Sequence, residues 1–405
     1  MKPKNITLRR RLAYVVSQLE DESLPSRHSP RLNEERQRRL MEEKVTIQRS
    51  LDSMVYPILT LPVEIMTEIF LHCLPNHPLY PRKAVAPMLL GRICRQWRNI
   101  ACSTPRLWAQ LVVSSRRGPS FELLLREWLR RARATPLSLH LWLPHSCSEH
   151  SSSLLATFPF TGHWAQMTSF HGSCFTPAEC LDLLVRAPQL THCEFNIDAV
   201  STLPSPFQST SKLLLARLQH LELTSLLLLV LDSLTTPALH SLKITGRLQP
   251  VAATVLHSFL ERAPKLHTFD ASSYDPRGIA RDGILCNVLR AIPLLTSFRL
   301  AMHSTASFFE LLRLLNESPA FLPRIQNITF LSFSRVDWTE TNINTFIDTV
   351  ISRWEATSTA TQLLEFKLLM DPFYDQILDD RISACVSKLE EQGMRIYVGH
   401  PKTLY

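Results

Sequence analysis

Two patterns of apolar and polar residues run along this chain, and the more specific one spans residues 58–75, ILTLPVEIMTEIFLHCLP. At helical spacing its apolar residues form two rows, about 100° apart around the helix. The rows are Leu61, Ile65 and Ile69 on one side and Met66, Phe70 and Leu74 on the other. Because a helix that faces a single core needs only one apolar stripe, the second row predicts contact with another surface.

The stretch MLLGRICRQWRNIACS, residues 88–103, has the same arrangement and predicts a second helix. One apolar line consists of Leu89, Ile93 and Trp97, and Leu90, Cys94 and Ala101 lie near another. Two interpretations of this helical pair stay open on the pattern alone. Either both rows are buried against the rest of the chain, or one row is left for a partner.

The second pattern is a repeat that begins near residue 165. Each segment has an apolar residue, two polar positions, an apolar residue, one free position and usually another apolar residue. The segments are AQMTSFHG, PQLTHCEF, ARLQHLEL, PALHSLKI, PKLHTFDA, PLLTSFRL, PRIQNITF and TQLLEFKL, at steps of 21 to 38 residues. Periods in this range predict stacked repeats, each too small to bury its own apolar face.

Helical stretches separate these segments, and each ends at the proline that opens the next strand. They are PAECLDLLVRAP, PVAATVLHSFLERAP, DGILCNVLRAIP and SFFELLRLLNESP. We therefore predict an irregular α/β solenoid, leucine-rich-repeat-like, with one strand layer and GMRIYVG as its last strand. Its inward positions include Leu190, Cys193 and Phe195, and Leu239, Leu242 and Ile244.

The fold class predicted for the whole chain is an α+β multidomain protein, with a short helical module ahead of the solenoid. Residues 1–32 mix charge with Ser and Pro without a sustained period and predict a disordered tail. Leu40, Ile47 and Met54 recur seven apart, which predicts a helix or a weak coiled-coil arm over 33–54. The helical module then covers 55–113 and the solenoid 114–405, with LSLHLWL as an early strand.

Composition indicates a compartment and excludes several enzyme classes. The 405 residues include nine cysteines without a CxxC pair, so we expect a reducing compartment, the cytoplasm or the nucleus. Only 9 glycines are present and no GxGxxG or GxxxxGK occurs, which argues against a glycine-rich phosphate loop. No apolar run is long enough for a membrane span, and we expect no cofactor and no membrane partner.

The net charge of +8 is concentrated in the first third of the chain. Residues 1–133 carry 24 Lys and Arg against 12 Asp and Glu. Such an excess favours solubility or an acidic protein partner, with nucleic acid as the alternative. The helix LLLREWLRRARA places Arg126, Arg130 and Arg133 along one face, which we interpret as solvated or interdomain. No nucleic-acid motif accompanies it, so we expect no nucleic-acid partner.

Candidate catalytic and metal-binding groups are weak. The loop HSCSEH, residues 145–150, has ligand chemistry but no zinc spacing. Cys193 falls at an inward strand position and His192 and His220 at outward ones, which argues against a catalytic Cys/His pair. The carboxylates of DPFYDQILDDR, residues 371–381, read as a polar helix start. We predict neither an enzyme nor a metal site.

The two helical stretches together resemble a known module. LPVEIMTEIF followed by ICRQWRNIA looks like an F-box, a trihelical module of about fifty residues, and STPRLWAQLVV and TPLSLHLWL are similar to fungal F-box proteins. The likeness covers about residues 35–145. The sequence departs from the F-box pattern in a longer, proline-rich loop over 76–86 and in Met66, which replaces the usual leucine.

This resemblance implies a substrate-recognition subunit of a cullin-RING (SCF-type) ubiquitin ligase. The F-box would dock on a small acidic Skp-type adaptor and, through it, the cullin, while the solenoid binds a protein target for ubiquitin-dependent degradation. Arg95 and Arg98 would face an acidic rim. The alternative is a non-degradative interaction scaffold. Matching the F-box motif position by position implies that the adaptor is contacted by Leu61, Pro62, Ile65, Ile69, Ile93, Cys94 and Trp97.

A target-binding stripe is predicted on the exposed strand face. Period-2 alternation leaves the fifth repeat position outward. Reading it down the repeats gives His171, Glu194, Glu222, Lys243, Asp270, Arg299, Thr329 and Lys367, whose sign changes from acidic to basic. A stripe of two signs would favour a ligand with the opposite charge order. The alternative is an ordinary solvated face, because exposed strand positions are polar in any case.

Overall fold

The chain divides into two compact units in the computed structural model: Met1–Cys73 with Leu90–Ala101, and Leu74–Leu89 with Cys102–Tyr405. The described residues are 3–21, 30–52, 57–75, 80–114, 119–142, 162–173, 177–196, 212–224, 230–245, 250–272, 284–301, 305–333, 336–356, 361–370 and 378–400.

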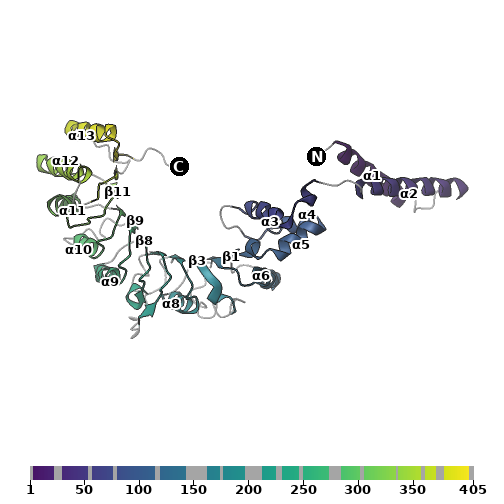
Figure 1. Ribbon diagram of the computed structural model, residues 1–405, viewed down its shortest axis with the longest axis horizontal. Helices are drawn as coiled ribbons and strands as arrows, with labels where there is room; N and C mark the ends of the chain where they lie inside the picture. Colours follow the sequence, from purple (N-terminus) through teal and green to yellow (C-terminus); the bar gives the residue numbers. More distant parts are fainter. Residues whose placement is uncertain are drawn as a thin grey trace. The chain divides into compact units, whose positions relative to one another are not determined.

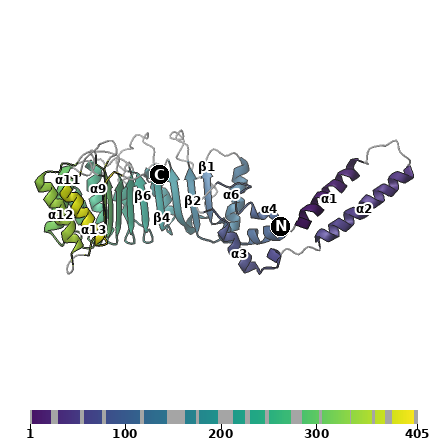
Figure 2. The ribbon, with the colours of Figure 1, turned by 90° about the horizontal axis from the view of Figure 1, so that it is seen from above.

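The first unit begins with a pair of helices that lie along each other, α1 (Pro3–Asp21) and α2 (Pro30–Asp52) (Figure 2). Val15 of α1 and Ile47 of α2 are buried, and Arg11 Nε lies 2.7 Å from Glu43 Oε1. The helix predicted over 33–54 therefore pairs within its own chain.

The prediction of a disordered tail over 1–32 is wrong for residues 3–21, which form α1. The physical reason is an apolar stripe at helical spacing that the charged composition obscures. Its members are Leu8, Leu12, Val15 and Leu19, of which Val15 is buried and the others are half-buried. Tertiary packing of this stripe stabilises a helix whose overall hydrophobicity is low.

The rest of the first unit is helical. A short 3₁₀ helix η1 (Pro57–Thr60) precedes α3 (Val63–His72), and α4 (Leu90–Ile93) precedes α5 (Arg95–Ser103). The second helical stretch is thus two helices rather than the single helix predicted. Cys94 separates them because its Sγ accepts from the Trp97 N–H at 3.4 Å and its carbonyl from the Arg98 N–H, as an N-cap does.

The second unit is built on one parallel sheet. Its order within the described residues is β1-β2-β3-β4-β6-β8-β9-β10-β11-β12-β13. The strands are β1 (Gln110–Ser114), β2 (Leu137–Trp142), β3 (Met167–Ser173), β4 (His192–Asn196), β6 (His220–Thr224), β8 (Ser241–Thr245), β9 (Thr268–Ser272), β10 (Ser297–Ala301), β11 (Asn327–Phe333), β12 (Glu365–Met370) and β13 (Arg395–Gly399). Consecutive strands lie side by side, as stacked repeats require.

Helices of this unit cover one face of the strand layer and leave the other face open (Figure 1). They are α6 (Pro119–Ala132), α8 (Pro177–Arg186), α9 (Pro250–Leu260), α10 (Ile284–Arg290), α11 (Thr305–Glu317), α12 (Glu340–Trp354) and α13 (Asp380–Glu391), with 3₁₀ turns η2 (Pro105–Trp108) and η5 (Trp164–Gln166). The strand-helix alternation confirms the predicted α/β solenoid, and β13 confirms GMRIYVG as a strand.

The core lies between the strand layer and the helices. The fourth and sixth repeat positions form two continuous inward rows, in register from strand to strand. Six inward residues named from the sequence are buried: Leu190, Cys193, Phe195, Leu239, Leu242 and Ile244. Aromatic rings interlock farther along, with Phe330 at 5.0 Å from Phe308 and 5.9 Å from Phe366 between ring centroids. The predicted single strand layer and its inward face are therefore confirmed.

The boundary at residue 113 is wrong. Gln110 to Val113 belong to β1, which pairs with β2, so the sheet begins inside the range predicted for the helical module. The turn η2 leads directly into β1 and carries Trp108, which stacks edge-on against Trp128 of α6. A second, two-stranded sheet of β5 (Leu213–Leu214) and β7 (Leu234–Thr235) was not predicted.

Two arginines join neighbouring repeats. Arg353 of α12 is 3% exposed and donates to the carbonyls of Leu315, Ser318 and Phe321, where α11 ends. Arg262, just after α9, makes the same kind of contact with carbonyls 28 to 31 residues earlier. These guanidinium groups satisfy carbonyls that would otherwise be buried without donors.

Among the described helices, none is both long enough and apolar enough to cross a membrane.

Candidate interaction surfaces

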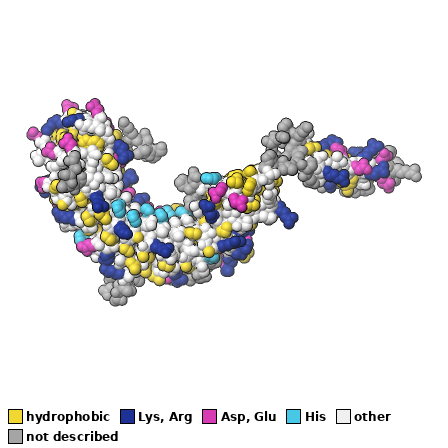
Figure 3. Space-filling model, viewed as in Figure 1, with side chains coloured by type: hydrophobic (Ala, Val, Ile, Leu, Met, Phe, Trp, Pro, Cys, Tyr) yellow, Lys and Arg dark blue, Asp and Glu magenta, His cyan; other side chains and the backbone are white. Residues whose placement is uncertain are grey.

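The two apolar rows of α3 differ in their exposure to solvent. Met66 and Phe70 are 1% and 0% exposed, whereas Ile65 is 50% exposed and Leu61, just before the helix, is 36% exposed. Pro62 is exposed at the N-cap of α3, and Ile69 is half-buried. Hydrophobic side chains gather over α3 in Figure 3. Met66 and Phe70 therefore build the core of this segment, and Leu61 and Ile65 are exposed beside it, while Ile69 and Leu74 are half-buried.

The three predicted adaptor residues of the second stretch are placed differently from one another. Ile93 is 53% exposed at the end of α4. Trp97 is half-buried, with its ring 4.9 Å from the Phe70 ring, and Cys94 acts as the cap described above. Trp97 and Cys94 thus hold α5 and α3 in place, and Ile93 is the member of the three that presents a free apolar side chain.

Two further exposed apolar residues lie beside the predicted row. Val63, the first residue of α3, is 54% exposed, and Ile58 in η1 is 38% exposed. They were missed because they fall outside the two helical rows. A count of apolar residues per turn, rather than row membership, could have found them.

Charge around this apolar surface is mixed. Arg95 is exposed, while Arg98 donates to the Gly91 carbonyl at 2.7 Å and so has a structural contact as well. Glu64 and Glu68 of α3 are exposed carboxylates on the same helix as Ile65.

Charges of the predicted target-binding stripe pair with one another along its first half. His171 Nε2 lies 2.8 Å from Glu194 Oε2, and Lys243 Nζ lies 2.8 Å from Glu222 Oε1. The hydrogen bond to Glu222 raises the pKa of Lys243. In-register stacking of parallel strands brings these neighbours together. The fifth-position side chains do lie in register along the strands, but Glu194 and Glu222 already have partners.

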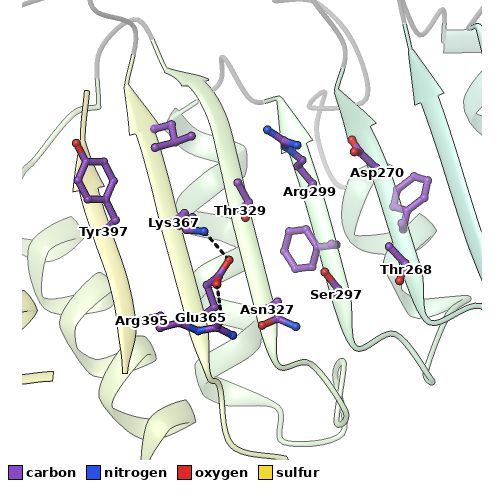
Figure 4. Close-up of a pocket in the computed structure, with 13 residues that line it drawn as sticks. Thr268, Asp270, Ser297, Arg299, Asn327, Thr329, Glu365, Lys367, Arg395 and Tyr397 are labelled. Atoms are coloured by element: carbon purple, nitrogen blue, oxygen red, sulfur yellow. Dashed lines mark hydrogen bonds and ion pairs between the residues drawn. The ribbon is translucent and has the colours of Figure 1, made fainter. Parts of the chain in front are cut away.

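The second half of the strand face forms a pocket of about 680 Å³ over β9 to β13 (Figure 4). It brings together Asp270, Arg299 and Lys367 from the predicted stripe and leaves Glu194, Glu222 and Lys243 outside. Its third-position side chains are Thr268, Ser297, Asn327, Glu365 and Arg395, and its fifth-position ones are Asp270, Arg299, Thr329, Lys367 and Tyr397. The hydroxyl and amide side chains on β9 to β11 are short, and the strand face is therefore hollowed there.

A row of histidines crosses the open strand face, and the sequence analysis missed it (Figure 3). Three pairs of rings stack in neighbouring repeats: His140 with His171 and His192 with His220 on adjacent strands, and His240 with His267 one residue ahead of β8 and β9, at 4.5, 4.3 and 5.5 Å between ring centroids. The three pairs occupy different repeat positions, so comparing any one position across the repeats does not reveal them. Burial and the neighbouring His171 lower the pKa of His140 to about 4.

Among the described residues, the candidate catalytic groups named from the sequence do not come together. Cys193 is 3% exposed, and burial raises the pKa of its thiol far above the ordinary value, so it is not a nucleophile. Residues 145–150 and 371–377 lie outside the described part of the chain, whereas Asp379 caps α13 by accepting from the Arg381 N–H. Arg126 and Arg130 pair with Glu122 and Glu127 on the exposed side of α6.

No group of three or more His, Cys, Asp or Glu side chains in the described ranges has the geometry to hold a metal ion.

The fold defines a parallel-strand solenoid preceded by helices, and comparisons with known proteins add little to that class. No family model matches the chain, and no curated protein matches it. One solved structure with some likeness is the leucine-rich repeat-containing protein LegL7 from Legionella pneumophila, at 15% identity and a TM-score of 0.36. The match covers 76% of this chain and 89% of that one. A TM-score this low supports no further argument, so the fold class is assigned from the strand pairing of this chain alone.

Proposed function

We propose that this chain is a substrate-recognition subunit of an SCF-type ubiquitin ligase, with its α3 to α5 segment docking on a Skp-type adaptor. The observation that carries the proposal is the exposure of Leu61 and Ile65 in one apolar row of α3, beside Met66 and Phe70 of the other row, which are buried. Leu61, Ile65 and Ile93 are exposed and belong to the residues onto which the F-box resemblance carries adaptor contact. Exposed apolar side chains grouped in this way are typical of an interaction site.

The solenoid would supply target selection, and the chain itself would carry out no chemistry. Its contribution would be proximity: a target held near the conjugating enzyme reacts at a high effective concentration. The open strand face supports this role because repeat solenoids use such faces as extended binding surfaces.

A non-degradative scaffold is the second candidate, and one observation favours it. Glu64 is exposed in the first turn of the helix that presents Ile65, so an acidic partner would meet like charge there. A scaffold would use the strand face in the same way without binding the adaptor or the cullin.

Affinity purification of the full chain separates the two candidates. The ligase role predicts that adaptor and cullin co-purify with the wild type and are lost with Leu61→Ala combined with Pro62→Ala, because truncating a central interface anchor costs about 2 kcal/mol or more. Leu123→Ala is the matched control, since Leu123 of α6 is 71% exposed and lies outside the α3 to α5 segment. Undiminished co-purification with the double variant, or none with the wild type, would contradict the ligase role.

A further inference from the structure

The pocket over β9 to β13 lies where the charge on the strand face changes sign. At the third and fifth positions, β4 to β9 carry Glu194, Glu222 and Asp270 against Lys243, three acids less one base, or a net −2 without the histidines. The same positions of β10 to β13 carry Arg299, Lys367 and Arg395 against Glu365, a net +2. The change falls between the neighbouring strands β9 and β10.

Most of the charges in the pocket are already satisfied. Glu365 lies between two cations, with Lys367 Nζ at 2.8 Å from one carboxylate oxygen and Arg395 Nη1 at 3.3 Å from the other. The Tyr397 hydroxyl donates to the His400 carbonyl. Glu365, Lys367 and Arg395 form a paired wall with a net charge of +1 on the β12 and β13 side, and Figure 4 shows its two ion pairs as dashed lines.

Two groups at the sign change are incompletely satisfied, although Asp270 also has Lys243 beside it on β8, whose ammonium is bonded to Glu222. Within the described part of the chain, Arg299 has neither an ion pair nor a side-chain hydrogen bond, and its side chain is exposed. Asp270 is in register with Arg299 on the adjacent strand, and its Oδ1 is buried without a hydrogen-bond partner. That buried oxygen is out of reach of a ligand, and a ligand meets Asp270 where its side chain lines the pocket.

From this geometry we infer that the pocket binds an extended, mixed-charge segment of a target protein, with an acidic side chain on Arg299 and a basic side chain of the same segment on Asp270. The inference rests on the proposed role of the solenoid in target selection and names the chemistry of the target. Adjacent strands lie about 4.8 Å apart, and alternate side chains of an extended segment about 6.6 Å apart, so the two contacts fit side chains two residues apart.

A carboxylate fits the pocket better than a phosphate does. The Arg299 guanidinium offers a planar fork that matches one carboxylate through two hydrogen bonds. Thr329 and Ser297 flank Arg299 and add hydroxyl donors. A phosphate dianion would bring a second charge close to Asp270 and Glu365, while Lys367 and Arg395 are already paired with Glu365.

The test is a selection of random dodecapeptides displayed on phage against the full-length chain. The wild type should enrich peptides with an acidic residue two positions from a basic residue. Arg299→Glu should abolish the acidic preference. Arg313→Glu is the matched control, because Arg313 lies on the exposed face of α11, with its side chain 63% exposed, away from the pocket. It should leave the enrichment unchanged.

One enriched peptide then gives the affinities by fluorescence anisotropy. Replacing its acidic residue with Gln should weaken binding about tenfold or more, and Arg299→Lys should give an intermediate loss, because it keeps the charge without the fork. A selection without enriched sequences, an enrichment that Arg299→Glu leaves intact, or tighter binding of a phosphoserine version would overturn the inference. The adaptor is absent from this assay, so failure of the ligase role and failure of the pocket are told apart.

Discussion

The α3 to α5 segment and the strand solenoid use apolar residues in different ways. In the solenoid the apolar residues at the fourth and sixth positions of each repeat point inward and form the core. Polar side chains and stacked histidines occupy the open face. In α3, Met66 and Phe70 of one row are buried, whereas Ile65 of the other is 50% exposed. An apolar pattern wider than the fold requires therefore points to a partner, whereas a pattern of the required width points only to a core.

The largest expected effect tests the two uses of apolar residues directly. Phe330→Ala, in the core of the solenoid with the ring 0% exposed, should lower the free energy of unfolding by about 3–5 kcal/mol. Ile65→Ala should change it by about 0.5 kcal/mol or less, because the side chain is exposed. Denaturant unfolding followed by circular dichroism measures both. Equal losses would show that Ile65 belongs to a core.

The arginines between repeats should give the next largest effect. Arg353→Ala removes donors from three carbonyls at the end of α11, and we expect a loss of about 2–4 kcal/mol in unfolding free energy. Arg313→Ala, on an exposed face with a loose 3.9 Å ion pair to Glu317, should cost about 0.5 kcal/mol or less. A loss at Arg353 as small as that at Arg313 would contradict the role assigned to Arg353.

The histidine pairs predict a pH dependence of stability in the solenoid. His140 has a lowered pKa of about 4 in the folded chain, so the unfolded chain binds the proton more readily. Stability is therefore lost as the pH falls below the unfolded value of about 6.5 toward 4. We expect His140→Gln to reduce the loss between pH 7 and pH 5 by about 1 kcal/mol, after allowance for partial exposure. His257→Gln on α9 is the control, and an unchanged pH profile of His140→Gln would contradict the prediction.

The smallest effect should come from the charge pairs on the open face. A double-mutant cycle of Glu222→Gln and Lys243→Met should give a coupling of about 0.2–1 kcal/mol, because the pair is partly solvated. Added salt should reduce it. A coupling well above this range would mean that the stripe stabilises the fold and is less free to serve recognition.

Much of the solenoid follows from the sequence because its signals are local. The proline that opens five of the eight repeat segments and the alternation of inward and outward residues lie within eight residues of one another, and the structure places Leu239, Leu242 and Ile244 in the core as expected. The stretch over residues 3–21 was misjudged for the opposite reason. Its apolar stripe is stabilised by packing against α2, which lies later in the chain, so the stretch cannot be judged from its own residues.

The site was less accessible from sequence because it depends on register. Reading one position per repeat found Asp270, Arg299 and Lys367, which line the pocket. The same reading could not show that Glu365 holds Lys367 and Arg395, since Glu365 and Arg395 occupy the third position and Lys367 the fifth. Which charges remain unpaired is a property of neighbouring strands together and is not encoded in any one of them.

The most direct test of the proposed docking is a titration of purified Skp-type adaptor into the full-length chain by isothermal titration calorimetry. Wild type should bind, and Ile65→Asp, which places a charge on the uncovered row, should weaken binding by about a hundredfold or more. Leu123→Asp, the same change at an exposed leucine of α6, should bind as the wild type does. Equal affinities of Ile65→Asp and Leu123→Asp, or no binding by the wild type, would contradict the account.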